Sequence, residues 1–308
     1  MNPPEFKEKF KKKYSKLLGD ELETFLEWSL KPLQKTIRVN TNKITRKKLI
    51  TLLEKKGWTV KPLKYYENGL KISNNNTALG NTLEHFLGYY YVQESASMLP
   101  PIILNPEKNE SILDSCAAPG SKTTQLSMMM ENKGIIVAND VSIGRVKILS
   151  SNLQRTGCEN VIITRNTATS FHVRQNEFDK ILVDAPCSAT GAIRKKYDII
   201  RQWNENTPIK MCGLQKQILY SCLQALKKGG ELVYSTCTLE PEENENVVNH
   251  AIKKFGVKLL PAKIKGFKTR PGITNWDEEK YDPTIKKCAR IYPQDNNTEG
   301  FFIAKMKK

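Results

Sequence analysis

The sequence predicts an α/β fold with a mostly parallel sheet and helices on both faces, preceded by a small α+β N-terminal domain. Two observations support this prediction. From about Asn105 onward, apolar β-prone runs alternate with helical stretches, which is typical of a parallel sheet. Upstream of that point, one helical stretch lies among short strands in a βαββ order. A length of 308 residues accommodates two domains, and we place their boundary between residues 105 and 106.

The N-terminal part begins with a helical stretch. Residues 1–30 are predicted to be helical because Phe6, Phe10, Tyr14 and Leu17 recur at helical spacing. A strand at 36–40, a helix at 44–56 that ends at Gly57, strands at 58–61 and 69–72, and a polar loop at 73–77 follow. The βαββ pattern over about 36–72 is RRM-like, with Lys and Arg expected at its exposed positions. Residues 1–105 are therefore predicted to form a small α+β module.

The C-terminal part, residues 106–308, contains the predicted parallel sheet. Strands are expected at about 111–115, 134–139, 160–164, 179–183 and 230–235, and helices at about 122–131, 142–156, 208–228 and 242–254. A closing strand is expected at 301–304. Residues 261–298 are rich in Pro, Lys and Asn and are expected to form a long irregular insertion, which in a compact domain is usually functional.

Composition favours a nucleic-acid partner. The formal net charge is +17, and 39 Lys outnumber 10 Arg, so much of the surface is suited to gripping a phosphate backbone without reading bases. The alternatives are a merely soluble basic protein and a membrane-surface protein. We place both behind nucleic acid, because no basic amphipathic anchor is visible.

Several segment types are absent from the sequence. No apolar run approaches the roughly 18 residues of a membrane span, and no stretch at the N-terminus resembles a signal peptide. Seven cysteines without short paired spacings fit a reducing cytoplasm. With three His and no Cys-x-x-Cys, we expect no metal site. We also expect a monomer, because no coiled-coil heptads or exposed apolar helix faces stand out.

Two cysteines follow predicted strands. Cys187 lies in Val-Asp-Ala-Pro-Cys-Ser and Cys237 in Tyr-Ser-Thr-Cys-Thr, each directly after an apolar run. Ligands of open α/β sheets bind outside the carboxyl ends of the strands, so both thiols are placed for chemistry. Either cysteine alone is more simply a small core residue. The pair, with Asp184 three residues before Cys187, favours a reactive site.

A small-residue turn predicts the cofactor site. Residues 112–124 form a strand, a turn with Ala-Ala-Pro-Gly, and a helix start whose N–H groups face any ligand. Neither a P-loop nor a Gly-x-Gly-x-x-Gly dinucleotide turn is present. Asp140 ends the next strand, where it suits ribose hydroxyls or equally caps the following helix. The pattern favours a mononucleoside-type cofactor, and S-adenosylmethionine is the candidate.

An ordered set of motifs resembles one family. The motifs are Ile-Arg-Val-Asn-Thr at 37–41, Tyr-Val-Gln-Glu-Ser-Ala-Ser at 91–97, the turn at 116–122, Asp-Ala-Pro-Cys-Ser-Ala-Thr-Gly at 184–191, Ser-Thr-Cys-Thr at 235–238, Arg-Ile-Tyr-Pro at 290–293 and Gly-Phe-Phe-Ile-Ala at 300–304. Together they resemble the Nop/Sun (RsmB-like) RNA cytosine-5 methyltransferases. The resemblance implies a Rossmann-like class I methyltransferase domain at 106–308. With the basic charge, it also implies that the module at 1–105 binds RNA.

The resemblance also implies a cofactor site. The residues expected around S-adenosylmethionine are Cys116, Ala117, Ala118, Pro119, Gly120, Ser121, Lys122, Asp140, Arg145, Thr167 and Asp184. Two of them depart from the usual pattern. Thr167 stands where an acidic residue is usual, so Asn166 or Thr167 is expected to make a weaker contact. Ser121 replaces a usual Gly.

By the same resemblance, Cys237 is the nucleophile and Cys187 assists product release. Asp184 is expected to hydrogen-bond the pyrimidine edge, and Lys122 to contact the base or stabilise developing charge. The run Arg194-Lys195-Lys196 is expected to contact phosphate beside the site.

Three functions remain open from the sequence. RNA cytosine-5 methylation leads, with tRNA favoured over rRNA because the chain is compact and lacks charged tails. DNA cytosine methylation would use Cys187 as the nucleophile instead. The third is a catalytically silent RNA-binding protein. The presence of both thiols argues against it, because such a protein would not need them.

Overall fold

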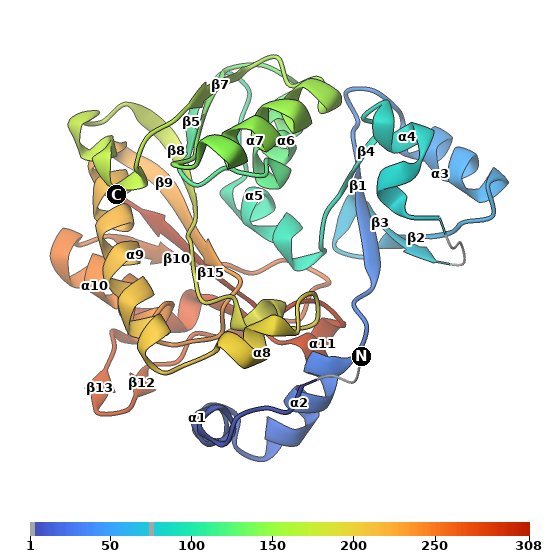
Figure 1. The fold of residues 1–308 in the computed structure, drawn as a ribbon. Helices are drawn as coiled ribbons and strands as arrows, with labels where there is room; N and C mark the ends of the chain where they lie inside the picture. Colours follow the sequence, from blue (N-terminus) through green and yellow to red (C-terminus); the bar gives the residue numbers. More distant parts are fainter. Residues whose placement is uncertain (1–3, 74–76) are drawn as a thin grey trace.

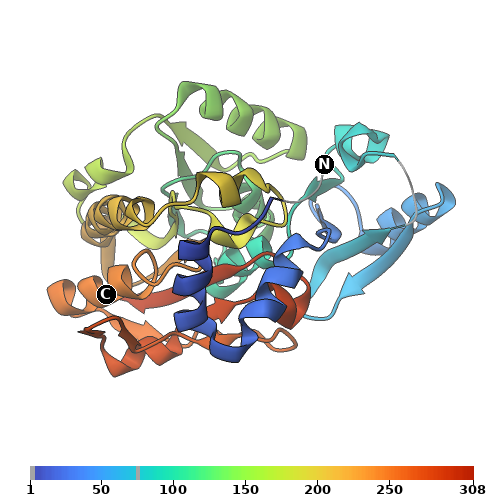
Figure 2. The same ribbon diagram turned by 60° about the horizontal axis from the view of Figure 1, so that its bottom comes forward.

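Two N-terminal helices pack against the C-terminal part of the chain. The computed structural model describes residues 4–73 and 77–308. The predicted helical stretch forms α1 (Glu8–Leu18) and α2 (Leu22–Leu30), separated by a short 3-10 turn. Tyr14 and Phe25 stack in one cluster with Trp203, Leu239 and Tyr292. Figure 2 shows both helices lying in front of the red and orange C-terminal segment.

The small sheet has four antiparallel strands in the order β2-β3-β1-β4. The bounds are β1 (Lys35–Val39), α3 (Arg46–Lys55), β2 (Thr59–Leu63), β3 (Tyr66–Ser73), α4 (Leu83–Phe86) and β4 (Tyr90–Val92). Leu49 and Leu53 of α3 are fully buried against the sheet, as their helical spacing predicts. The predicted βαββ order is present, whereas β4 is an additional strand. Most of the predicted loop at 73–77 lies outside the described residues.

The strands of the large sheet are β5 (Ser111–Asp114), β6 (Ile135–Asn139), β7 (Val161–Thr164), β8 (Phe178–Asp184), β9 (Leu226–Thr236), β10 (Lys258–Leu260), β11 (Arg270–Pro271), β14 (Ala289–Ile291) and β15 (Phe301–Lys307) (Figure 1). Their order is β11-β14-β15-β9-β8-β5-β6-β7, and β10 also pairs with β15. The five from β7 to β9 are parallel, and β15 runs antiparallel to β9. The predicted Rossmann-like fold is confirmed.

Helices cover both faces of this sheet. They are α5 (Leu99–Leu104), α6 (Ser121–Met129), α7 (Ile143–Thr156), α8 (Asp198–Gln202), α9 (Asn206–Ala225) and α10 (Glu245–Phe255). Along β8, Leu182 packs in the cluster of α5 and α6, whereas Ile181 and Val183 pack in the cluster of α9 and α10. Strands buried on both faces read as continuous apolar runs, which is why they were recognisable in the sequence.

Three sequence predictions need correction. The helix expected at 208–228 ends at Ala225, because β9 already begins at Leu226. The helix expected at 242–254 begins at Glu245, after a turn. Residues 261–298 are not simply irregular: they contain β11 (Arg270–Pro271), β12 (Asn275–Trp276), β13 (Glu279–Lys280), β14 and α11 (Pro293–Asn296), and β10 (Lys258–Leu260) precedes them. Short strands of two or three residues have too few alternating positions to be visible in a sequence.

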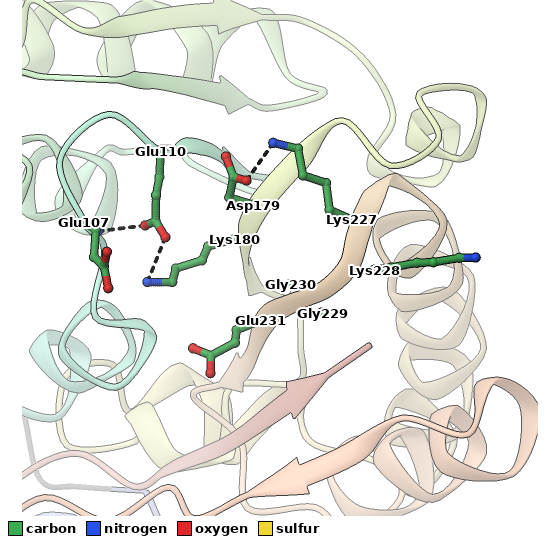
Figure 3. Close-up of a pocket in the computed structure, with 9 residues that line it drawn as sticks. All are labelled: Glu107, Glu110, Asp179, Lys180, Lys227, Lys228, Gly229, Gly230 and Glu231. Carbon is green, nitrogen blue, oxygen red and sulfur yellow. Dashed lines mark hydrogen bonds and ion pairs between the residues drawn. The ribbon is translucent and has the colours of Figure 1, made fainter.

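The amino edge of the large sheet holds a charged hollow (Figure 3). Lys180 lies 3.0 Å from Glu110, and Lys227 lies 2.6 Å from Asp179. In each pair the lysine neutralises the carboxylate. Because this hollow lies at the sheet edge opposite the cysteines, we assign it a structural role and no catalytic one. Within residues 4–73 and 77–308, no helix combines the length and apolar character needed to cross a bilayer.

Candidate active site

The two predicted cysteines meet at the carboxyl edge of the large sheet. Cys187 follows β8 and Cys237 follows β9, which are adjacent parallel strands with Asp184 opposite Ser235. Their Sγ atoms are 3.4 Å apart. The N–H of Gly191 donates to the carbonyl of Cys237 at 2.9 Å, which ties the two loops together. A Cβ at Gly191 would lie 2.1 Å from the carbonyl oxygen of Gly300, so this close approach requires glycine.

Lys122 and Asp184 form an ion pair beside the cysteines. Lys122 Nζ lies 2.7 Å from Asp184 Oδ2 and donates to Ser97 Oγ at 3.0 Å. The other carboxylate oxygen of Asp184 accepts from Ser235 Oγ at 2.8 Å. Lys122 is only 7% exposed, and the carboxylate of Asp184 is about a third exposed. Lys122 therefore holds the carboxylate of Asp184 in place, and that carboxylate faces the site.

Burial, hydrogen bonding and a nearby charge act on Cys187 and Lys122. The hydrogen bond to Cys237, followed by burial, raises the pKa of Cys187 well above its usual value, so Cys187 remains a thiol at neutral pH. Burial acts to lower the pKa of Lys122, but attraction to Asp184 outweighs it and raises that pKa. The ammonium group also interacts electrostatically with Cys237. The site thus contains a protonated Cys187 and a positive charge near Cys237.

One cavity of about 460 Å³ joins the cysteines to the predicted cofactor residues. Of the predicted set, its lining includes Cys116, Ala118, Asp140, Arg145, Thr167, Asp184, Cys187 and Cys237. Ala117, Pro119, Gly120, Ser121, Lys122 and Asn166 are not part of the lining. Gly120 has φ +104°, and a Cβ there would lie 2.9 Å from Leu149 Cδ1. Gly120 therefore allows the turn to pack closely against α7, although it does not line the cavity.

Asp140 is buried in the lining of this cavity, directly after β6. Its Oδ1 accepts from the N–H of Ser142 at 3.1 Å, but the residue that caps α7 is Ser142, whose side chain accepts from the N–H of Arg145, so the capping role predicted for Asp140 is wrong. Its Oδ2 has no hydrogen-bond partner, although Arg145 lies 3.3 Å away. A buried carboxylate oxygen without a donor costs free energy unless a ligand supplies one.

The cavity also includes residues that we did not assign to the site: Ser115, Asn139, Val141, Ala168, Ala185, Pro186, Leu214 and Ile218. Asn139 precedes Asp140 at the same strand end, a signal that could have identified it. Leu214 and Ile218 come from α9, and their helical spacing also fits an ordinary core face. Sequence alone could not assign them to a cavity.

The expectation that Arg194 contacts phosphate is wrong. Its side chain is 6% exposed and donates to the carbonyls of Lys31, Pro32 and Thr298 at 2.7–3.0 Å. Asn297 Oδ1 accepts a further bond at 2.7 Å. Arg194 therefore fastens the end of α2 to the C-terminal segment, whereas the neighbouring Lys195 and Lys196 remain exposed.

Comparison with protein families gives two adjoining matches. A model described as 16S rRNA methyltransferase RsmB/F matches residues 101–307. A second, described as the N-terminal domain of 16S rRNA methyltransferase RsmF, matches residues 6–95. Together they account for most of the chain.

Curated relatives of two kinds are similar to the chain. The tRNA (cytosine(49)-C(5))-methyltransferase of Pyrococcus abyssi is 41% identical over 312 residues, covering 99% of both chains. The ribosomal RNA small subunit methyltransferase F of Vibrio vulnificus is 38% identical over 311 residues. That match covers 99% of this chain but 64% of the relative, so this chain spans about two thirds of the length of that protein.

Solved structures of methyltransferases have the same fold as this chain. A methyltransferase homolog from Pyrococcus horikoshii superposes with a TM-score of 0.86 at 39% identity, covering 96% of this chain and 93% of its own. NSun6 from Pyrococcus horikoshii, solved with SFG, superposes with a TM-score of 0.88 at 27% identity over 98% of both chains. The chain is an enzyme that belongs to the family its motifs predict, the Nop/Sun (RsmB/F) family of S-adenosylmethionine-dependent RNA (cytosine-5) methyltransferases.

Proposed function

We propose that this enzyme methylates carbon 5 of a cytosine in tRNA, with Cys237 as the nucleophile and Cys187 as the group that frees the product. The observation that supports this proposal best is the cysteine pair at the wall of a cavity that also contains Asp140 and Asp184. A silent RNA-binding protein would have no use for two thiols at this distance.

Carbon 5 of cytosine is a poor nucleophile until a thiolate adds to carbon 6. Cys237 forms that bond, and carbon 5 then has the electron density to attack a methyl group. The thiolate is the reactive form of cysteine, and the ammonium group of Lys122 supplies positive charge near Cys237. S-Adenosylmethionine, when bound, provides the methyl group on a positively charged sulfur.

Release requires loss of the carbon 5 proton and cleavage of the bond between Cys237 and carbon 6. Cys187 lies 3.4 Å from Cys237, close enough to protonate the departing Cys237 sulfur. The thiolate that this leaves at Cys187 then takes up the carbon 5 proton, which restores the Cys187 thiol. Asp184 holds the pyrimidine edge, where a proton shared at N3 eases addition at carbon 6. Lys122 and Ser235 fix the carboxylate of Asp184 in place.

The cavity fits S-adenosylmethionine. Asp140 Oδ2 is a buried acceptor without a donor, and ribose hydroxyls are donors. The guanidinium of Arg145 donates to the carbonyl of Ala118 at 2.5 Å and so holds the turn against the end of β6. The cavity also reaches Asp184 and the two cysteines, as a methyl donor must.

Asp140→Asn is expected to weaken binding of S-adenosylmethionine by about tenfold, because a hydrogen bond to a charged acceptor contributes roughly 1.5–3 kcal/mol and the amide keeps only part of it. Isothermal titration calorimetry measures the change. Asp20→Asn, at an exposed carboxylate on the N-terminal turn, is the control and should bind as wild type does. Equal affinity of Asp140→Asn and wild type would remove Asp140 from the cofactor site.

The choice of tRNA is supported by similarity. The tRNA methyltransferase of Pyrococcus abyssi is 41% identical to this chain, and the rRNA methyltransferase of Vibrio vulnificus is 38% identical. Methylation of rRNA is the second candidate, favoured by the descriptions of both family models.

Bisulfite sequencing of tRNA and rRNA from cells lacking the protein tests this choice. We expect one 5-methylcytosine to disappear from tRNA while rRNA remains unchanged. Loss from rRNA with unchanged tRNA would contradict the proposal and establish the second candidate.

The small N-terminal sheet is proposed to bind the RNA backbone. Lys61 of β2 and Lys64 directly after it are exposed, as are Lys47 and Lys48 of α3, the helix that packs against this sheet. These charges are consistent with the sequence prediction for residues 1–105. Action as a monomer in the cytoplasm also remains a prediction. Size-exclusion chromatography with light scattering and cell fractionation test these two points.

A further inference from the structure

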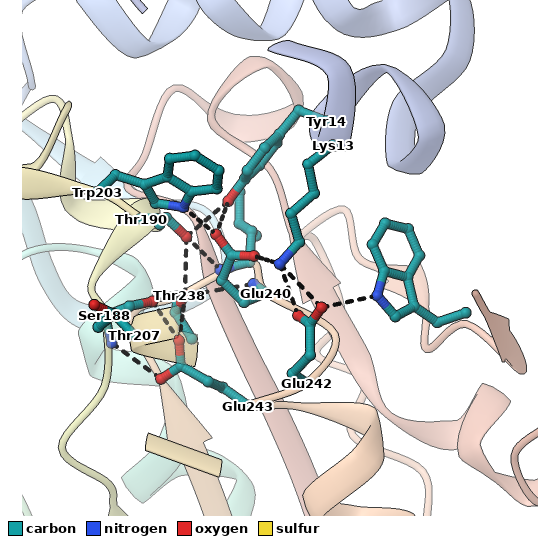
Figure 4. A network of polar contacts seen from close by, with 12 residues as sticks. Lys13, Tyr14, Ser188, Thr190, Trp203, Thr207, Thr238, Glu240, Glu242 and Glu243 are labelled. Atoms are coloured by element: carbon teal, nitrogen blue, oxygen red, sulfur yellow. Dashed lines mark hydrogen bonds and ion pairs between the residues drawn. The ribbon is translucent and has the colours of Figure 1, made fainter. Parts of the chain in front are cut away.

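Helix α1 reaches the active-site loops although it lies more than 170 residues away in sequence. The hydroxyl of Tyr14 lies 2.8 Å from Thr190 Oγ1 and 3.2 Å from Glu240 Oε1. Lys13 Nζ lies 2.6 Å from Glu240 and 2.9 Å from Glu242 (Figure 4). Thr190 follows Cys187 by three residues and Glu240 follows Cys237 by three, so one helix contacts both cysteine loops.

A chain of hydroxyl groups continues from these contacts to the cysteines. Thr190 Oγ1 lies 2.9 Å from Thr238 Oγ1, which lies 2.8 Å from Ser188 Oγ. Ser188 directly follows Cys187, and Thr238 directly follows Cys237. At the far end, Glu243 accepts from the N–H of Ser188 at 3.0 Å (Figure 4). The spacing of the two thiols is thus set by bonds between their immediate neighbours.

The network lies largely out of contact with water, and both Tyr14 and Lys13 keep their protons. Tyr14 is 1% exposed and Glu240 is fully buried. Burial, together with the charge of Glu240, raises the pKa of Tyr14 well above its usual value, so its hydroxyl keeps its proton. Burial acts to lower the pKa of Lys13, but attraction to Glu240 and Glu242 outweighs it and raises that pKa. Lys13 therefore remains charged beside two carboxylates.

Lys13 and Tyr14 occupy the face of α1 that meets the loops, whereas Lys11 points elsewhere and pairs only with Glu8 on the surface. An apolar side chain at position 14 would suffice to pack against Phe10 and Phe25. A helix needed only for packing gains nothing from a buried tyrosine hydroxyl and a half-buried lysine that both contact the cysteine loops, because removing polar and charged groups from water costs free energy.

We propose that α1 is a positioning element of the active site, in which Tyr14 and Lys13 hold the two cysteine loops at the separation that the reaction requires. The inference rests on the proposed roles of Cys187 and Cys237. Neither Tyr14 nor Lys13 touches the substrate, since both act through Thr190 and Glu240.

Tyr14→Phe and Lys13→Met test the proposal. Both are expected to lower kcat on the order of tenfold while the KM for S-adenosylmethionine stays unchanged, because a small displacement of reacting groups slows chemistry without altering the cofactor cavity. The substrate is a tRNA pool from cells lacking the protein. Lys13→Arg should restore most of the rate, and Lys11→Met is the matched control on the same helix.

A second readout needs no RNA. The rates at which iodoacetamide alkylates Cys187 and Cys237, followed by peptide mass spectrometry, should change in Tyr14→Phe and Lys13→Met but not in Lys11→Met. If alkylation changes while the wild-type enzyme methylates no tRNA, the proposed function fails and the positioning role stands.

Variants that melt earlier but keep wild-type kcat and wild-type alkylation rates below their melting temperature would overturn the proposal. In that case α1 would stabilise the fold alone. A loss of rate in Lys13→Arg equal to that in Lys13→Met would also contradict it, because the charge would then not be the feature that positions Glu240.

Discussion

Cys237→Ala is expected to abolish methyl transfer, lowering the rate by about 10⁴-fold or more, the scale on which loss of a covalent nucleophile acts in other enzymes. Without the thiolate, carbon 5 has no means of becoming nucleophilic, and neither cofactor nor RNA binding replaces that step. Transfer of radiolabelled methyl from S-adenosylmethionine to a tRNA pool measures the loss.

The control for this experiment is Cys158→Ala. Cys158 is also a free, half-buried thiol, but it follows α7 and does not line the cavity that contains the cysteine pair. We expect it to retain activity. A Cys237→Ala enzyme that transferred methyl groups at the wild-type rate would show that another group attacks carbon 6.

Cys187→Ala is expected to trap the enzyme on its RNA. Methyl transfer proceeds because Cys237 remains, but the bond between Cys237 and carbon 6 is not cleaved. The covalent complex should then accumulate and appear as a slowly migrating band in a denaturing gel. Turnover should stop after about one methyl group per enzyme, since each active site is used once.

The same gel distinguishes the DNA-type alternative. That alternative makes Cys187 the nucleophile, so Cys187→Ala would form no complex and Cys237→Ala would. The positive charge of Lys122 near Cys237 favours Cys237 as the nucleophile. A silent RNA-binding protein would form no complex with either variant.

The catalytic core could be predicted from the sequence because local signals mark it. Strands buried on both faces give continuous apolar runs, so the ends of β8 and β9, and with them Cys187 and Cys237, were visible. Parallel strands end at one edge of the sheet. That rule alone brings the two cysteines together without knowledge of any contact.

Long-range packing could not be predicted in the same way. Helical spacing identified residues 1–30 as helical but gave no sign that Tyr14 would meet Thr190. Arg194 looked like part of an exposed basic run, yet its four acceptors come from two distant segments and bury it. The cavity residues Leu214 and Ile218 have the spacing of an ordinary core face. In each case the deciding partner is far away in sequence.

The most direct test of the account is to locate the trapped nucleotide. Cys187→Ala is incubated with S-adenosylmethionine and a tRNA pool, the covalent complex is isolated and digested, and peptide mass spectrometry identifies the modified residue. The account predicts a methylated cytidine on Cys237. A nucleotide on any other residue, or no covalent complex from an enzyme that still transfers methyl groups, would contradict it.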